Sequence, residues 1–233
     1  ATLTPPNEPV SPPQITTPIR YKYNDPTIKE PYPLKNSFYD ADGKPLTIVK
    51  QERDAEGVWT VYFSGTLKTI GGNSFTASSP DISYIKIDNG NESITIDNFA
   101  FYNCTALTEI TLNEKLETIG EYAFYNCAAL TGDLVIPESV TSIGDYAFQS
   151  CYGLNGKITI EGNEAGTTIG NYAFSGCTAV TSLELGEGIT SIGNSAFYNC
   201  SGIKGDLVIP DSVTSLGEGA FRRCSGFNGE LKL

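Results

Sequence analysis

Apolar and polar residues follow a short pattern that returns along most of the chain. After Cys104, Ile110 and Leu112 flank Thr111, and this alternation predicts a short strand with one buried face. Gly120 comes later, where the chain must turn sharply, and the Ala-Phe pair beyond it is expected to occupy a helical or 3₁₀-like turn on the opposite side. The other apolar positions of this unit are Leu107, Leu116, Ile119 and Phe124.

The unit recurs with the motif Ala-Phe-x-x-Cys, which the chain contains six times. The motif ends at Cys104, Cys127, Cys151, Cys177, Cys200 and Cys224, so successive copies lie 23, 24, 26, 23 and 24 residues apart. A period in the twenties indicates a solenoid with one short strand per turn, in which stacking buries the apolar side of each turn. Residues 70–75 form a degenerate copy without Cys, typical of a capping repeat, and we assign the repeats to residues 58–233.

Two different segments precede the repeats. Residues 1–33 hold nine of the thirteen prolines, and proline supplies no backbone donor, so we expect an extended linker or tether; a proline-rich docking peptide is the alternative. Residues 34–57 predict a small β cap with strand-like residues at 46–49. Asp40 and Asp42 are interpreted as turn residues rather than a calcium loop, because the later ligands of such a loop are missing.

The repeats resemble the BspA-like leucine-rich repeats, a bacterial family with the pattern Ile-x-Ile-Pro-x-x-Val-x-x-Ile-Gly-x-x-Ala-Phe-x-x-Cys. The copy that follows this pattern most closely runs from Val208 through Pro210 and Gly217 to Cys224. The resemblance implies a right-handed leucine-rich-repeat array with a parallel β-sheet on its concave face and short helical or 3₁₀ turns opposite. It also implies an exported or cell-surface protein of host-associated bacteria. Some members of the family act as adhesins, and the resemblance supplies no catalytic residue.

Charge and composition exclude several classes of function. The formal net charge is −12, and residues 58–233 carry −11 of it, so the basic footprint of a nucleic-acid binder is missing. The chain contains no His, which removes His-based catalysis and most zinc or iron sites, and we expect no metal and no cofactor. No apolar run is long enough to cross a bilayer. The first residue is Ala rather than Met, so we expect a leader to have been removed or trimmed.

The six cysteines are expected to be free buried thiols. Stacked copies of the motif would lie about 4.8 Å apart, beyond the roughly 3.5–4.5 Å that separates the Cβ atoms of a disulfide. Each internal cysteine also has two equivalent neighbours, so no pairing is singled out. Thiols spread along a line do not converge on a metal ion.

Aromatic residues also recur beside the motif. Tyrosine stands two residues before the repeat phenylalanine at Tyr122, Tyr146 and Tyr172, and directly after it at Tyr102, Tyr125 and Tyr198. These side chains are expected to cover the side opposite the strands and to support its turns. The alternative is a sticky aromatic stripe for sugars or protein.

The outward residues of the predicted strands define a candidate binding face, because residues between inward apolar positions point to solvent. The central outward positions are Thr111, Val135, Thr159, Glu184, Val208 and Lys232, and the flanking ones are Glu109, Asp133, Lys157, Ser182, Asp206 and Glu230. Four of the six flanking residues are acidic. Like charges at sheet spacing repel, so a basic patch on a protein partner would offset their cost. Screening by solvent and salt, with nothing bound, is the alternative.

Three functions stay open, in order of preference. The first is an extracellular or cell-surface protein-binding module of the adhesion type, with a host matrix or surface protein as partner, since repeat arrays offer extended binding surfaces. The second is a structural spacer or surface-layer component without a specific ligand. The third is a glycan-active enzyme, which needs two carboxyls about 5–10 Å apart, such as those of Glu109 and Asp133, but a flat ladder of strands lacks the necessary cleft.

Overall fold

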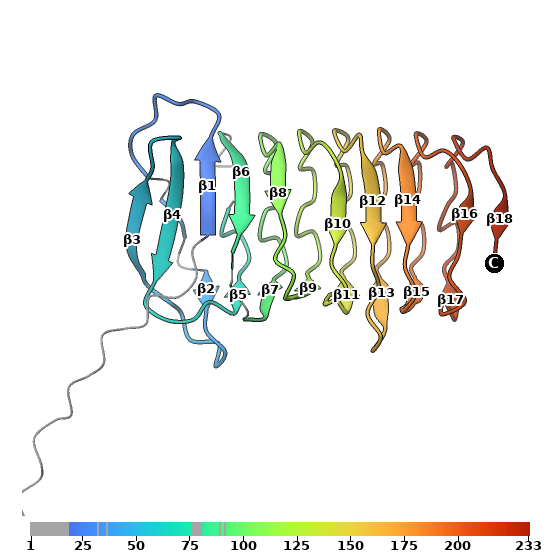
Figure 1. Cartoon of the computed structure of the whole chain (residues 1–233), viewed down its shortest axis with the longest axis horizontal. Helices are drawn as coiled ribbons and strands as arrows, with labels where there is room; N and C mark the ends of the chain where they lie inside the picture. Colours follow the sequence, from blue (N-terminus) through green and yellow to red (C-terminus); the bar gives the residue numbers. More distant parts are fainter. Residues whose placement is uncertain (1–18, 32, 36, 76–80, 89, 91) are drawn as a thin grey trace, which may run out of the picture.

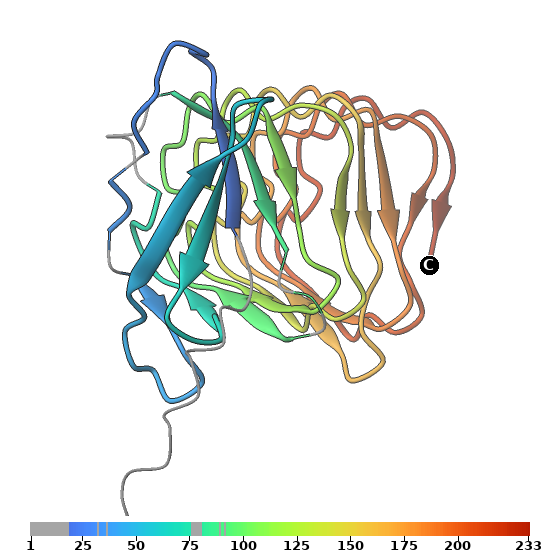
Figure 2. The same ribbon diagram turned by 60° about the vertical axis from the view of Figure 1, so that its left-hand side comes forward.

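The protein is a solenoid of stacked turns. The structure, a computed structural model, describes residues 19–31, 33–35, 37–75, 81–88, 90 and 92–233. Each turn of the repeats runs through one strand, crosses to a second strand and returns through a series of tight turns (Figure 1, Figure 2). The turns succeed one another along a nearly straight line in Figure 1, so we name the faces by their strands.

One strand of each turn lies on what we call the front face. The front strands are β6 (Ile82–Ile87), β8 (Glu109–Thr111), β10 (Leu134–Ile136), β12 (Lys157–Ile160), β14 (Ser182–Leu185), β16 (Leu207–Val208) and β18 (Leu231–Lys232). Parallel pairs form between β6 and β8, between β10 and β12, between β12 and β14, and between β16 and β18. Residues alternate as predicted: Leu134 and Ile136 are buried, and Val135 between them is exposed.

A second strand in each turn forms a rear sheet, so the expectation of one strand per turn is wrong. The rear strands are β2 (Phe38–Tyr39), β5 (Thr69–Ile70), β7 (Ile94–Ile96), β9 (Leu116–Ile119), β11 (Ser142–Ile143), β13 (Thr167–Ile169), β15 (Ile189–Ile192) and β17 (Ser215–Leu216). Only β2 runs antiparallel to its neighbour, β5. Pairing between turns creates these strands: Thr118 of β9 lies between Thr95 and Ser142 of the adjacent turns.

The third side consists of linked tight turns, which corrects the expectation of helical or 3₁₀ turns. Among the described residues the structure contains no helix. In one turn, the N–H groups of Ala123, Tyr125 and Cys127 each donate to the carbonyl three residues earlier. Tyr122 and Asn126 have positive φ values, 54° and 56°, which a right-handed helix cannot contain. The chain therefore reverses direction at each of these residues instead of winding into a helix.

Three antiparallel strands close the N-terminal end. They are β1 (Ile19–Tyr23), β3 (Ile48–Arg53) and β4 (Val58–Phe63), and β1 lies between β4 and β6. The β3–β4 hairpin spans the boundary expected between residues 57 and 58, so β4 pairs with the cap and not with a repeat strand. Trp59 of β4 is buried and stacks on Tyr21 of β1, with ring centroids 6.3 Å apart.

Strand β1 corrects the expectation of a linker over residues 1–33. No proline falls between Pro18 and Pro26, so each intervening residue keeps the N–H group that a strand between two neighbours requires. Residues 1–18, the rest of the proline-rich part before β1, lie outside the described residues. Asp40 is a turn residue, as predicted: its Oδ1 accepts hydrogen bonds from the N–H groups of Asp42 (3.0 Å) and Lys44 (2.9 Å).

The core is a continuous stack of phenylalanine rings. The stack comprises Phe75, Phe101, Phe124, Phe148, Phe174, Phe197 and Phe221, with neighbouring centroids 4.8–5.2 Å apart. All six cysteines are free and buried beside it. Each thiol donates to a phenylalanine carbonyl of the preceding turn, as Cys151 Sγ does to the carbonyl of Phe124 (3.2 Å). Burial raises the pKa of Cys104 to about 12.

Candidate functional site

The front face presents the predicted outward residues in register. The paired residues are Val135 with Thr159, Thr159 with Glu184, Lys157 with Ser182, Val208 with Lys232, Glu109 with Tyr84 and Thr111 with Lys86. Lys157 Nζ also forms an ion pair with Oε2 of Glu184. Val135 and Val208 are the exposed apolar side chains of this face at the central positions, at 49% and 48%.

The following turn donates hydrogen bonds to two of the four acidic side chains in the flanking row. The N–H of Lys157 donates to Oδ1 of Asp133 (2.7 Å), and the N–H of Glu230 donates to Oδ1 of Asp206 (2.8 Å). The hydrogen bond from Lys232 Nζ, followed by that from the Glu230 amide, lowers the pKa of Asp206 from its ordinary value. Donors from the following turn therefore offset part of the charge repulsion along this row, at Asp133 and Asp206, and a basic patch on a protein partner stays a prediction.

The series of front strands is broken at two places. Within the described part of the chain, no backbone hydrogen bond joins β8 to β10 or β14 to β16. Each break precedes the same segment, Gly-Asp-Leu-Val-Ile-Pro, at 132–137 and at 205–210. In the turn after the first copy, the N–H of Glu161 donates to a carbonyl at the end of β10 (3.1 Å). Pro137 and Pro210 occupy the equivalent position and have no N–H to donate.

An inserted glycine contributes to both breaks. Gly132 and Gly205 are extra residues relative to the preceding turns and have φ values of 80° and 86°. The N–H of Gly132 donates to Oδ1 of Asn155 (3.0 Å), and that of Gly205 donates to Oδ1 of Asn228 (2.9 Å). Each insertion is thus tied to the following turn and not to the preceding one.

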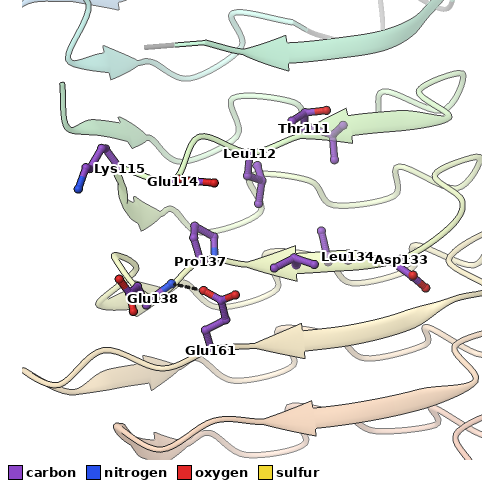
Figure 3. Close-up of a pocket in the computed structure, with 11 residues that line it drawn as sticks. Thr111, Leu112, Glu114, Lys115, Asp133, Leu134, Pro137, Glu138 and Glu161 are labelled. Atoms are coloured by element: carbon purple, nitrogen blue, oxygen red, sulfur yellow. Dashed lines mark hydrogen bonds between the residues drawn. The ribbon is translucent and has the colours of Figure 1, made fainter. Parts of the chain in front are cut away.

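A hollow of about 450 Å³, which we call the front hollow, opens at the first break. Its apolar floor consists of Ile110, Leu112, Leu134, Val135 and Pro137, and its charged rim consists of Glu114, Lys115, Asp133, Glu138 and Glu161. Figure 3 shows Leu112 extending between β8 and β10 toward Pro137. The N–H of Glu138 donates to Oε2 of Glu161 (2.8 Å) across the rim. Four carboxylates against one ammonium group favour a basic partner.

Glu109 and Asp133, the carboxylate pair considered for glycan hydrolysis, line different hollows. Asp133 borders the front hollow, whereas Glu109 lines a separate one beside Lys22 and Tyr84. Among the described residues, no cluster of three or more Cys, Asp or Glu side chains is arranged to hold a metal ion. In the same part of the chain, no helix is long and apolar enough to span a membrane.

The side of the tight turns carries a second surface feature, made of aromatic side chains. One row, which we call the outer aromatic row, consists of Phe99, Tyr122, Tyr146 and Tyr172, and a shorter row consists of Tyr102 and Tyr125. Tyr198 lies beneath the guanidinium group of Arg223, 5.5 Å from it. The tyrosines of both rows are half-buried, so part of each ring meets solvent.

The repeat pattern identifies the front residues but not the front hollow. The signal is present, since the segment at 132–137 returns without change at 205–210 while the other turns lack it. It is hidden because the proline belongs to the general repeat pattern. Phe99 is also missed as the first member of the outer aromatic row, because it is not a tyrosine.

Stacked turns with parallel strands and a period of 23–26 residues define a leucine-rich-repeat solenoid. The sequence pattern of the family described as "BspA type Leucine rich repeat region" matches residues 55–155 and 156–229, with six copies. The chain belongs to this family, and both the predicted fold class and the family resemblance are confirmed. No curated protein matches the chain.

Solved structures of bacterial leucine-rich-repeat proteins are similar to this chain. A leucine-rich-repeat protein of T. pallidum is 21% identical, with 77% of this chain and 87% of that chain covered and a TM-score of 0.48. A leucine-rich cell surface protein from Faecalibacterium prausnitzii A2-165 is 20% identical, with 88% and 77% covered and a TM-score of 0.26. A leucine-rich-repeat protein from Bacteroides ovatus ATCC 8483 is 21% identical, with 76% and 72% covered and a TM-score of 0.29. None of these likenesses bears on the ligand.

Proposed function

We propose that the protein is an extracellular or cell-surface protein-binding module of the adhesion type, and that the front hollow is the centre of its binding face. The observation that carries the proposal is the hollow itself, in which apolar side chains lie open to solvent beneath an acidic rim. Membership of the BspA type family supports a location outside the cell, because the resemblance implies exported proteins.

The chemistry of the front hollow fits a segment of a partner protein. Val135 is 49% exposed on the floor, so an apolar side chain of the partner would remove apolar surface from water there. Glu114 and Glu138 are exposed on the rim, where they would meet Lys or Arg side chains beside that apolar residue. The proposed partner segment is therefore an apolar residue flanked by basic ones, within a host matrix or host surface protein.

Binding of purified extracellular-matrix proteins, measured by surface plasmon resonance at low and high salt, tests the function. We expect saturable binding to at least one member of the panel, and we expect it to weaken as salt rises because the rim is charged and exposed. A structural spacer predicts no saturable binding, and that result would contradict the proposal. Protease treatment of intact cells of the source bacterium tests the location, since a surface module is cleaved while the cells stay closed.

A matched pair of variants tests the position of the site. Val135→Asp places a charge on the floor of the front hollow, and Val208→Asp places the same charge at the equivalent point of the second Gly-Asp-Leu-Val-Ile-Pro segment. The two valines have almost equal exposure, 49% and 48%. Loss of a central anchor costs roughly tenfold or more in affinity, so Val135→Asp should show that loss while Val208→Asp binds like the parent protein. Equal losses in both variants would show that the front hollow is not the centre.

A further inference from the structure

The outer aromatic row is a regular stack that stops partway along the solenoid. The rings of Phe99 and Tyr122 lie 5.1 Å apart, those of Tyr122 and Tyr146 lie 4.7 Å apart, and those of Tyr146 and Tyr172 lie 5.2 Å apart. Their planes are within 9° of parallel. Tyr146 covers one face of the Tyr172 ring, and the other face points toward the next turn.

The next two turns keep the backbone of this row but lack its rings. Ser195 and Gly219 occupy the position that Tyr172 occupies one and two turns earlier. The φ values are 54° at Tyr172, 53° at Ser195 and 65° at Gly219, so the left-handed conformation continues without change. A bulky residue rarely adopts this conformation, yet four consecutive turns carry an aromatic residue there. The row therefore ends because side chains are missing and not because the backbone diverges.

A hollow, which we call the turn-side hollow, lies where the rings are missing. Its volume is about 770 Å³, and its lining includes Tyr172, Asn194, Ser195, Glu218 and Arg222. Within the described residues, no intramolecular hydrogen bond or ion pair is formed by the Ser195 hydroxyl, the Glu218 carboxylate, the Arg222 guanidinium or Nδ2 of Asn194. Donors and acceptors thus stand around one uncovered aromatic face.

We propose that the turn-side hollow binds a pyranose ring of a glycan, which stacks on the uncovered face of Tyr172 and takes the place of the missing ring at Ser195. A pyranose presents a flat face of C–H groups to the aromatic ring and hydroxyl groups around its edge. The edge hydroxyls donate to Glu218 and accept from Arg222 and the Asn194 amide. The aromatic side chain of a partner protein would satisfy Tyr172 but would leave these polar groups without partners, so the glycan fits the hollow better.

Saturation-transfer NMR with four methyl glycosides tests the proposal directly. The probes are the methyl pyranosides of glucose, galactose, mannose and N-acetylglucosamine, each at about 10 mM, a concentration that saturates a millimolar site. We expect transfer to at least one of them. Tyr172→Ala should weaken its affinity about two- to tenfold, the range that corresponds to one lost ring contact. Transfer to none of the four would overturn the proposal.

Two further variants separate loss of the site from loss of the fold. Tyr122→Ala removes a ring at the same repeat position but away from the hollow, and it should leave the transfer unchanged. Ser195→Tyr restores the missing ring at a residue whose φ already matches that of Tyr172, so it should abolish transfer without lowering the melting temperature. Equal loss in Tyr122→Ala, or transfer that persists in Ser195→Tyr, would contradict a site at this position.

One more probe distinguishes the two kinds of ring. N-acetyltyrosine amide should not displace the bound glycoside at equal concentration, because it lacks the hydroxyls that the hollow is lined to receive. If it displaces the glycoside and binds more tightly, the site serves an aromatic side chain of a protein and the glycan proposal is wrong. The front-hollow variants, Val135→Asp and Val208→Asp, should leave glycoside binding intact, so the two proposals succeed or fail separately.

Discussion

Phe148→Ala removes one ring from the middle of the phenylalanine stack. Phe148 is fully buried, and its ring lies 4.9 Å from that of Phe124 and 5.1 Å from that of Phe174. Truncation of a buried phenylalanine costs about 3–5 kcal/mol, because apolar contacts are lost and a cavity remains. Two parallel ring contacts are lost at once, each worth about 0.5–1.5 kcal/mol. We therefore expect the upper part of the range, about 4–5 kcal/mol of unfolding free energy.

Phe221→Ala is the matched control at the last ring of the same stack. Phe221 is half-buried and stacks on one ring only, that of Phe197 at 5.2 Å, with Phe227 edge-on at 6.4 Å. Less surface is buried and one parallel contact is lost, so we expect a cost of about 1–3 kcal/mol. The difference between the two losses of unfolding free energy measures what full burial and a second parallel ring contact contribute to stability.

Urea denaturation followed by two probes provides the assay. Trp59 is the single tryptophan and lies in the N-terminal cap, so its fluorescence reports that end. Far-UV circular dichroism reports all the strands. Turns of a repeat array are coupled only through their neighbours, so Phe148→Ala should also separate the two transitions in urea. The reasoning is refuted if Phe148→Ala costs no more than Phe221→Ala.

Three other predictions concern the thiols, the glycines and the acidic row. Thiol reagents at neutral pH should label the native protein slowly and reach six sites in urea, because the cysteines are buried and burial raises the pKa of Cys104 to about 12; rapid labelling of the native protein would show that the motif is not packed inside. Gly156→Ala should lower the unfolding free energy by about 1–3 kcal/mol, since its Cβ would clash with Oδ1 of Asp133 and would lie 2.6 Å from the carbonyl carbon of Gly132; an unchanged melting temperature would contradict this close approach. Because the pKa of Asp206 is lowered in the folded protein, its contribution to stability is present above the ordinary carboxyl pKa and is lost as pH falls through the lowered value; Lys232→Ala should raise the NMR titration midpoint of Asp206, and an unmoved midpoint would show that the ion pair does not form.

The inward positions of the repeat could be predicted because every turn packs against its neighbours in the same way. A residue between two identical turns must match what lies on either side, so a small buried Cys and a large buried Phe return at each copy. The same regularity predicts Val135, Thr159 and Glu184 in one row, and the strand pairing confirms that register.

The rear strands and the tight turns could not be predicted because their causes lie outside the local pattern. Leu116 and Ile119 are three residues apart, which does not show the alternation of a strand, and β9 exists because the turns on both sides offer hydrogen bonds. Tyr122 adopts a left-handed conformation, which a bulky residue rarely does, so the usual sequence signal for a left-handed residue is missing at that position. Strand β1 was hidden by the prolines around it.

Departures from the repeat carry more information about binding than the repeat itself does. A residue that returns in every turn is explained by its packing against the turns on either side. A residue that departs from the repeat is not explained in this way and needs a local cause. Pro137 removes a donor that the stack uses in the next turn, and the front hollow opens beside it. Ser195 removes a ring that the stack carries four times, and the turn-side hollow opens there. The turn-side hollow arises from one missing ring in an otherwise regular array, so Ser195→Tyr, which restores that ring, should close the site while the fold is kept.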